Sequence, residues 1–118
     1  MNDDVTTLAD LKRTMANFVG ERDWNRFHTP KNLAASICIE AAELAEHFQW
    51  READQCERDR LPPEKLQEIG DECADVLAYL LSLANRLEFD LTEVFDRKMK
   101  RNAEKYPIER FRGRSGSE

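Results

Sequence analysis

Residues 64–88 read EKLQEIGDECADVLAYLLSLANRLE and form the longest stretch of the chain with helical periodicity. At 100° per residue, its large aliphatic side chains cover roughly 160° of the helix circumference. These side chains are Leu66, Ile69, Val76, Leu77, Leu80, Leu81 and Leu83. An apolar arc of this width is typical of a helix at the centre of a core, or of a helix that a second subunit partly covers. The pattern alone leaves both interpretations open.

Three more helices are predicted on either side of this segment. The strongest start signal is Thr29 followed by Pro30, because threonine caps a helix N-terminus and proline suits its first turn. Asp90 followed by Glu93 resembles a capping box, and Thr6 and Thr7 are candidate caps of the first helix. The expected helices cover residues 8–19, 30–50, 64–88 and 91–106, with a polar loop over 51–61.

The length and the scarcity of turn residues set the fold class. The chain has 118 residues, room for one domain, and contains only four glycines and four prolines. So few turn-forming residues favour long helices over a sandwich or a barrel. We therefore expect an all-α four-helix bundle in a single domain over residues 1–111, followed by a disordered tail over residues 112–118.

The charge balance and the apolar runs argue against several classes of partner. Lys and Arg total 18 against 24 Asp and Glu, a net charge of −6 without a basic stripe, so we expect neither a nucleic acid polymer nor a membrane as partner. The longest apolar run, 76–84, is too short to span a bilayer, and residues 1–4 lack a signal-peptide pattern. Cys38, Cys56 and Cys73 form no zinc or disulfide pattern, so the expected location is a reducing cytoplasm.

Two of the predicted helices carry carboxylates in the same place, at the edge of the apolar stripe. In the second helix Glu40 borders the apolar residues and Glu43 lies about 60° to its other side. Glu72 and Asp75 repeat this arrangement in the third helix. If these edges pack together, four carboxylates converge, and burial and mutual repulsion raise their pKa values. Since carboxylate oxygens suit a hard cation, the sequence predicts a Mg²⁺ site on these four residues.

Other roles for the acidic residues are also compatible with the pattern. Acids on amphipathic helices usually form a solvated face, which is the preferred interpretation for Glu46 and Glu68. Glu68 and Asp71 form a competing pair that points further from the core and ranks second. A di-iron site needs a Glu-x-x-His motif on each of two helices, but His47 comes one residue late and the third helix has no histidine.

The carboxylate spacing matches a known family. EAAE (40–43), followed after 28 residues by ECAD (72–75), resembles the E-x-x-E…E-x-x-D signature of the MazG-like all-α nucleoside triphosphate pyrophosphohydrolases. Three further stretches resemble the dCTP pyrophosphatase branch of that family. They are RDWNRFHTPKNL (22–33), ELAEHFQW (43–50) and KMKRNAEKYP (98–107). The resemblance covers about residues 7–107.

The resemblance implies hydrolysis between the α- and β-phosphates of a nucleoside triphosphate, dCTP or a modified dCTP above all, to the monophosphate and pyrophosphate. Mg²⁺ on the four carboxylates would neutralise phosphate charge and orient the attacking water, and Glu43 is the residue we expect to accept the proton. Lys98, Asn102 and Lys105 share one face of the fourth helix and would bind the phosphate tail. A solvated helix face explains their spacing equally well.

The nucleotide base would lie among aromatic side chains. Trp24, Trp50 and Tyr79 are the candidates, because a stacked base gains ~1–3 kcal/mol from such a platform. His28 would hydrogen-bond the nucleotide by resemblance, or would cap the second helix. Core packing is the preferred interpretation of three phenylalanines, Phe18, Phe48 and Phe95.

Two other functions remain open from the sequence. The first is a MazG-type enzyme with another nucleotide specificity. The second belongs to a different class, a non-catalytic helical oligomerisation module whose acids are only a solvated surface. The wide apolar arc and the resemblance together imply a homodimer or a homotetramer.

Overall fold

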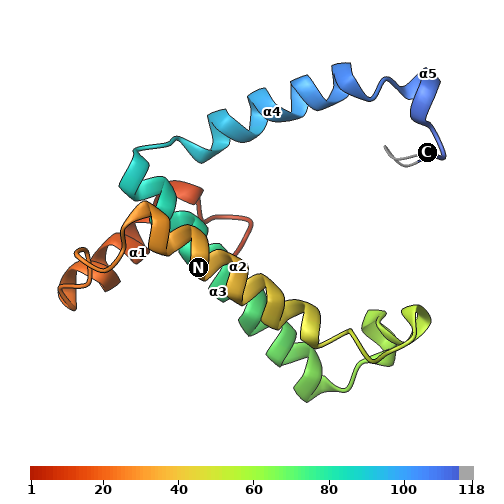
Figure 1. Cartoon of the computed structure of the whole chain (residues 1–118), viewed down its shortest axis with the longest axis horizontal. Coiled ribbons are helices and arrows are strands. Elements are labelled where there is room, and N and C mark those ends of the chain that lie inside the picture. The colour runs from red at the N-terminus through yellow and green to blue at the C-terminus, as the bar shows by residue number, and fades with distance from the viewer. Residues whose placement is uncertain (115–118) are drawn as a thin grey trace. The chain divides into compact units, whose positions relative to one another are not determined.

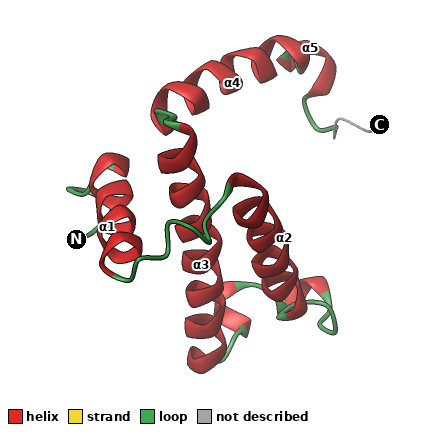
Figure 2. Cartoon of the chain, turned by 60° about the vertical axis from the view of Figure 1, so that its left-hand side comes forward, coloured by secondary structure: helices red, strands yellow, loops and turns green. Residues whose placement is uncertain are grey.

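The computed structural model describes residues 1–114, and every regular element among them is a helix (Figures 1 and 2). The elements are α1 (Leu8–Glu21), α2 (Pro30–Glu46), the short 3-10 helices η1 (Ala53–Gln55) and η2 (Arg58–Arg60), α3 (Pro63–Leu87), α4 (Leu91–Lys105) and α5 (Ile108–Phe111). The predicted all-α class is confirmed. None of these helices is long and apolar enough to cross a membrane.

The long helix α3 is the element against which α1 and α2 pack (Figure 2). α2 lies beside α3 and runs in the opposite direction (Figure 1). Each of the three helices contributes to the small buried core, which contains Val19, Leu33, Leu81 and Ala84. Burial of these side chains holds α2 against α3 and thereby fixes which of their polar residues meet.

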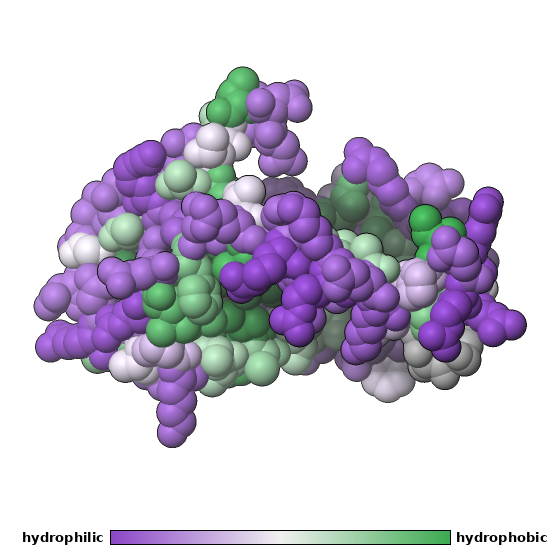
Figure 3. Space-filling model, turned by 90° about the horizontal axis from the view of Figure 1, so that it is seen from above, coloured by the Kyte–Doolittle hydropathy of each residue, from purple (hydrophilic) through white to green (hydrophobic). Residues whose placement is uncertain are grey.

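The wide apolar arc of α3 is only partly covered within the chain. Leu81 is buried, whereas Leu77 and Leu80 keep 39% and 41% of their surface exposed. Figure 3 shows apolar side chains exposed among hydrophilic ones on the face in view. α3 is therefore the central helix of its unit, and a second subunit over the rest of the arc stays a prediction.

The side-chain caps appear where the sequence predicts them. Thr7 Oγ1 accepts a hydrogen bond from the backbone N–H of Asp10 at 3.1 Å, and Asp10 accepts one from the backbone N–H of Thr7 at 2.9 Å. Thr29 caps α2 through its side-chain oxygen, and Pro30 occupies the first turn. Asp90 caps α4. Each cap satisfies a backbone donor at a helix start.

The helix ends are less well predicted than the starts. α2 ends at Glu46 rather than near Trp50, because the following N–H groups bond three residues back, as Phe48 does to the carbonyl of Ala45 at 3.0 Å. α1 continues through Gly20 to Glu21. The short helix α5 after Pro107 has too few residues to show periodicity and was not predicted.

The chain divides into two compact units. The first covers residues 1–88 and contains α1 to α3, and the second begins at Phe89 and contains α4 and α5. Within the second unit, the rings of Tyr106 and Phe111 meet edge to face with centroids 5.2 Å apart. A single domain over residues 1–111 stays a prediction, and residues 115–118 of the predicted tail lie outside the described residues.

Candidate functional site

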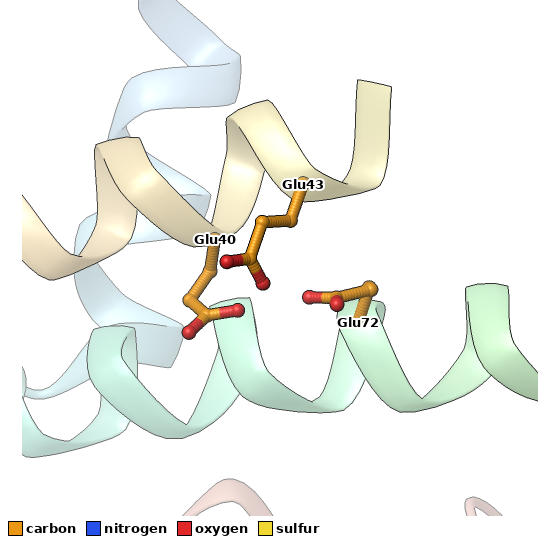
Figure 4. Close-up of side chains that lie close together, drawn as sticks. All are labelled: Glu40, Glu43 and Glu72. Carbon is orange, nitrogen blue, oxygen red and sulfur yellow. The ribbon is translucent and has the colours of Figure 1, made fainter. Parts of the chain in front are cut away.

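Three carboxylates meet where α2 and α3 lie side by side (Figure 4). Glu40 and Glu43, one turn apart, project from the same face of α2, and Glu72 projects toward them from α3. One oxygen atom of each residue lies within 4.8 Å of those of the other two, and all three side chains are half-buried. The packing of the two helices thus brings together three of the four carboxylates predicted to share a site.

Two oxygen atoms of this carboxylate cluster are buried without a partner. They are Oε2 of Glu40 and Oε2 of Glu72, which find no hydrogen bond among the described residues. The pKa of Glu40 rises from its ordinary value of 4.5 to about 7. The main cause is the facing carboxylate of Glu72, with which a protonated Glu40 can share a hydrogen bond, followed by burial and by the neighbouring Glu43.

The carboxylate cluster fits a divalent cation. Hard cations take carboxylate oxygens as ligands, and the two unpartnered oxygens are available for that role. A bound cation would also favour the ionised form of Glu40 and so lower its raised pKa. The residues that would hold it are Glu40, Glu43 and Glu72.

The fourth predicted carboxylate, Asp75, lies next to the cluster rather than in it. It is exposed, and it lines a pocket together with Glu40. Glu68 of the competing pair also lies outside the cluster, with cations nearby. Its Oε2 is 3.8 Å from Nζ of Lys65 and 4.0 Å from Nδ1 of His47. The structure therefore gives Glu68 a different neighbourhood from that of Glu72.

An aromatic pocket adjoins the carboxylate cluster. Its volume is about 320 Å³, at the lower end of the range of small-ligand sites. Trp24, His28 and Tyr79 line it, so it contains three of the predicted nucleotide-binding residues. The His28 ring lies 6.3 Å, between centroids, from both the Trp24 ring and the Tyr79 ring. Since Glu40 lines this pocket and belongs to the cluster, a ligand in the pocket would lie beside the carboxylates.

The remaining predicted site residues lie elsewhere on the chain. Trp50, in the turns after α2, is 89% exposed and does not line the aromatic pocket. Lys98, Asn102 and Lys105 line one shallow pocket on α4, in the second unit. Their common face agrees with the predicted spacing, and their role stays a prediction.

Three residues of the aromatic pocket were missed by the sequence analysis. Met15 and Phe18, one turn apart on α1, line it, and so does Ala78 of α3. Phe18 was expected in the core, but it is 41% exposed and meets Trp24 edge to face with centroids 5.7 Å apart. Helical spacing identifies the inner face of α1 but does not distinguish a pocket wall from a filled core. The run of aromatic residues at 24–28 is the only signal that a pocket lies there.

Comparison with known proteins finds a matching family model, curated relatives and a similar solved structure. The model of the MazG-like family matches residues 35–116. The dCTP pyrophosphatase 1 proteins of Mus musculus and Homo sapiens are 40% and 38% identical over 107 and 109 residues, or 91% and 92% of this chain. The chain spans only 63% and 64% of their length. A solved pyrophosphatase from Archaeoglobus fulgidus matches with a TM-score of 0.78 and 40% identity, covering 91% of this chain and 98% of that one.

The raised pKa of Glu40 predicts how stability depends on pH without metal. Between pH 4.5 and about 7 the folded chain binds more protons at this residue than the unfolded chain does. Its contribution to stability is therefore fully present below pH 4.5 and is lost as the pH rises through about 7. We expect the melting temperature in chelator to fall over this window, and the fall to be smaller in Glu40→Gln, which cannot ionise.

Glu46→Gln is the matched control for this experiment. Glu46 is an exposed acid of the same helix outside the carboxylate cluster, so its variant should keep the wild-type pH dependence. Equal slopes in wild type and Glu40→Gln would show that the cluster does not retain a proton.

Proposed function

The chain belongs to the MazG-like family, and on that premise we propose that it is a Mg²⁺-dependent nucleoside triphosphate pyrophosphohydrolase. Its substrate is dCTP or a modified dCTP, which it converts to the monophosphate and pyrophosphate. The observation that carries this proposal is the position of Glu40, which belongs to the carboxylate cluster and lines the aromatic pocket. Such an arrangement suits a ligand with a planar base at one end and phosphates at the other.

The proposed reaction requires little covalent chemistry from the protein itself. Water attacks the α-phosphorus, the bond from that phosphorus to the oxygen bridging to the β-phosphorus breaks, and Glu43 accepts a proton from the water. Glu40, Glu43 and Glu72 would hold Mg²⁺, and Asp75, which lines the pocket beside Glu40, would be the fourth ligand. The ion would supply positive charge against the phosphates.

The base is held in the aromatic pocket by Trp24, His28 and Tyr79 in this proposal. The rings supply stacking surfaces, and the imidazole supplies a hydrogen-bonding group. Support comes from the pocket itself, which contains these three side chains and two carboxylates. The two dCTP pyrophosphatase 1 relatives favour a cytosine base. Lys98, Asn102 and Lys105 are assigned to the phosphate tail, and their shared pocket on α4 supports this.

The proposal places the enzyme in the cytoplasm, where it removes unwanted nucleotides from the pool. Three free cysteine thiols, Cys38, Cys56 and Cys73, suit a reducing compartment.

Replacement of the cluster carboxylates tests the function. Glu40→Gln and Glu72→Gln each remove one negative charge at nearly constant shape, so they should abolish Mg²⁺-dependent pyrophosphate release from dCTP while leaving the helices folded. Mg²⁺ should raise the melting temperature of the wild type, because it binds the folded state, and should raise that of the variants much less. Pyrophosphate assays and thermal melting measure both effects.

Glu68→Gln is the control, since Glu68 lies outside the carboxylate cluster. It should retain most of the activity. Full activity in Glu72→Gln together with loss in Glu68→Gln would move the site to the competing pair. No release of pyrophosphate from any nucleotide by the wild type would favour the oligomerisation module.

Tryptophan replacements separate binding of the base from binding of the metal. Trp50 is almost wholly exposed in the single chain, so Trp50→Ala should leave the chain's own fold intact. If Trp50 stacks on the base, as the sequence predicts, KM should rise by roughly ten- to a hundredfold with a much smaller fall in kcat. Selectivity for dCTP over other triphosphates should weaken. If KM is unchanged in Trp50→Ala, the base is bound by Trp24 and Tyr79 instead. Trp24→Ala should then show the rise in KM.

We also propose that the chain forms a homodimer or a homotetramer. The exposed parts of Leu77 and Leu80 on α3 support a partner surface there, and Phe95 of α4 is 68% exposed. Light scattering at micromolar concentration should give at least twice the mass of one chain. Leu80→Glu should shift the distribution toward smaller species. A monomeric wild type would contradict the proposal.

A further inference from the structure

A second pocket, of about 190 Å³, shares His28 with the aromatic pocket. His28 is the one residue that lines both pockets. The other walls come from the end of α1, the turns before α2 and the last two turns of α3. They are Val19, Asn25, Ser82, Asn85, Arg86 and Glu88. We call this space the polar pocket.

Two residues of the polar pocket already have structural partners. The side-chain amide of Asn85 donates a hydrogen bond to the carbonyl of Lys12 at 2.9 Å, which ties α3 to α1. Nη1 of Arg86 donates one to the carbonyl of Asn25 at 2.9 Å, which ties α3 to the turns before α2. These bonds hold the walls of the pocket in place.

Two residues that line this pocket each have a buried polar side-chain atom without a partner among the described residues. One atom is Oγ of Ser82, a buried residue with 7% of its surface exposed. The other is Nδ1 of His28, the only one of its two ring nitrogens that is both buried and without a partner. Buried polar atoms are nearly always hydrogen-bonded, to protein or to ordered water. A pocket of this volume has room for water, and a water needs two to four polar partners of this kind.

The position of the His28 ring is fixed by other contacts, but its tautomer is not. The backbone N–H of His28 bonds to the carbonyls of Trp24 and Asn25, and the ring lies between those of Trp24 and Tyr79. A neutral imidazole has one donor and one acceptor nitrogen, and only a hydrogen bond to one nitrogen decides which is which.

We propose that Ser82 is a positioning residue for His28. A water in the polar pocket bridges Oγ of Ser82 and Nδ1 of His28, and so fixes the tautomer that Nε2 presents to the ligand. The effect on nucleotide binding rests on the proposed function. The effect of Ser82 on the tautomer of His28 rests on the two unpartnered atoms and on the pocket that both residues line.

The test compares Ser82→Val with Ser82→Thr, which have nearly the same shape and differ in the hydroxyl. The chain has only two histidines, so ¹⁵N spectra near pH 8 report the tautomers of His28 with His47 as internal reference. We expect one tautomer at His28 in the wild type and in Ser82→Thr, and a mixture of two in Ser82→Val. The signals of His47 should not change.

Kinetics supply a second readout of the same link. Loss of one hydrogen bond in the base pocket should raise KM for dCTP by roughly two- to tenfold in Ser82→Val, with kcat little changed, and Ser82→Thr should restore the wild-type value. Ser82→Ala, which cannot overpack the pocket, should show the spectrum and KM of Ser82→Val.

An identical His28 spectrum in wild type, Ser82→Val and Ser82→Ala would overturn the proposal, as would a tautomer mixture in the wild type. A wild type that hydrolyses no nucleotide would refute the proposed function instead. The ¹⁵N spectra would still decide whether Ser82 controls His28.

Discussion

The packing of α2 against α3 is the constraint on which the rest of the site depends. Leu33 and Ala84 are each 1% exposed, and Leu81 is 3% exposed. Full burial of one leucine side chain contributes about 1.5–3 kcal/mol, so a few such contacts fix the two helices in one register. Glu40 follows Leu33 by two helical turns and therefore lies near the same face. The hydrophobic contacts thus force the carboxylates together, and the raised pKa of Glu40 is the electrostatic consequence.

The parts of the candidate site follow one another along one face of α3. At 100° per residue, Glu72, Asp75, Tyr79, Ser82 and Arg86 lie within roughly 80° of one another around the helix. Along this face come first the carboxylate cluster, then the aromatic pocket and then the polar pocket. A single straight element therefore sets the order of the three parts. Their spacing depends on helix geometry rather than on loops, which suits a site that must hold its groups in fixed positions.

The sequence predicts those features of this chain that depend on local chemistry. The caps at Thr7, Thr29 and Asp90 are local hydrogen bonds, and the helix starts they predict are present. The end of α2 depends on where its backbone hydrogen bonds change to partners three residues back, which no single residue in the sequence indicates. Helical spacing predicted that Glu40, Glu43 and Glu72 would converge, because rotation about the axis decides that. It did not predict that Asp75 would stay outside the cluster, because spacing along one helix does not tell which of its carboxylates the facing helix meets.

Aromatic residues near the predicted helix ends are a different case. Phe18 and Trp50 are both aromatic residues near predicted helix ends, yet one lines a pocket and the other is exposed. Their surroundings depend on tertiary packing, so periodicity cannot separate them.

The buried polar atoms of this chain show where its sequence departs from a stable apolar core. The side-chain atoms without partners in the described residues belong to Glu40, Glu72, His28 and Ser82. All four residues line the carboxylate cluster or one of the two pockets beside it. A fold selected for stability alone would place an apolar side chain at position 82, between Leu81 and Leu83. Departures of this kind are expected at functional sites. Their confinement to one face of α3, to α2 and to the turns before α2 argues that this region was shaped by a ligand rather than by packing.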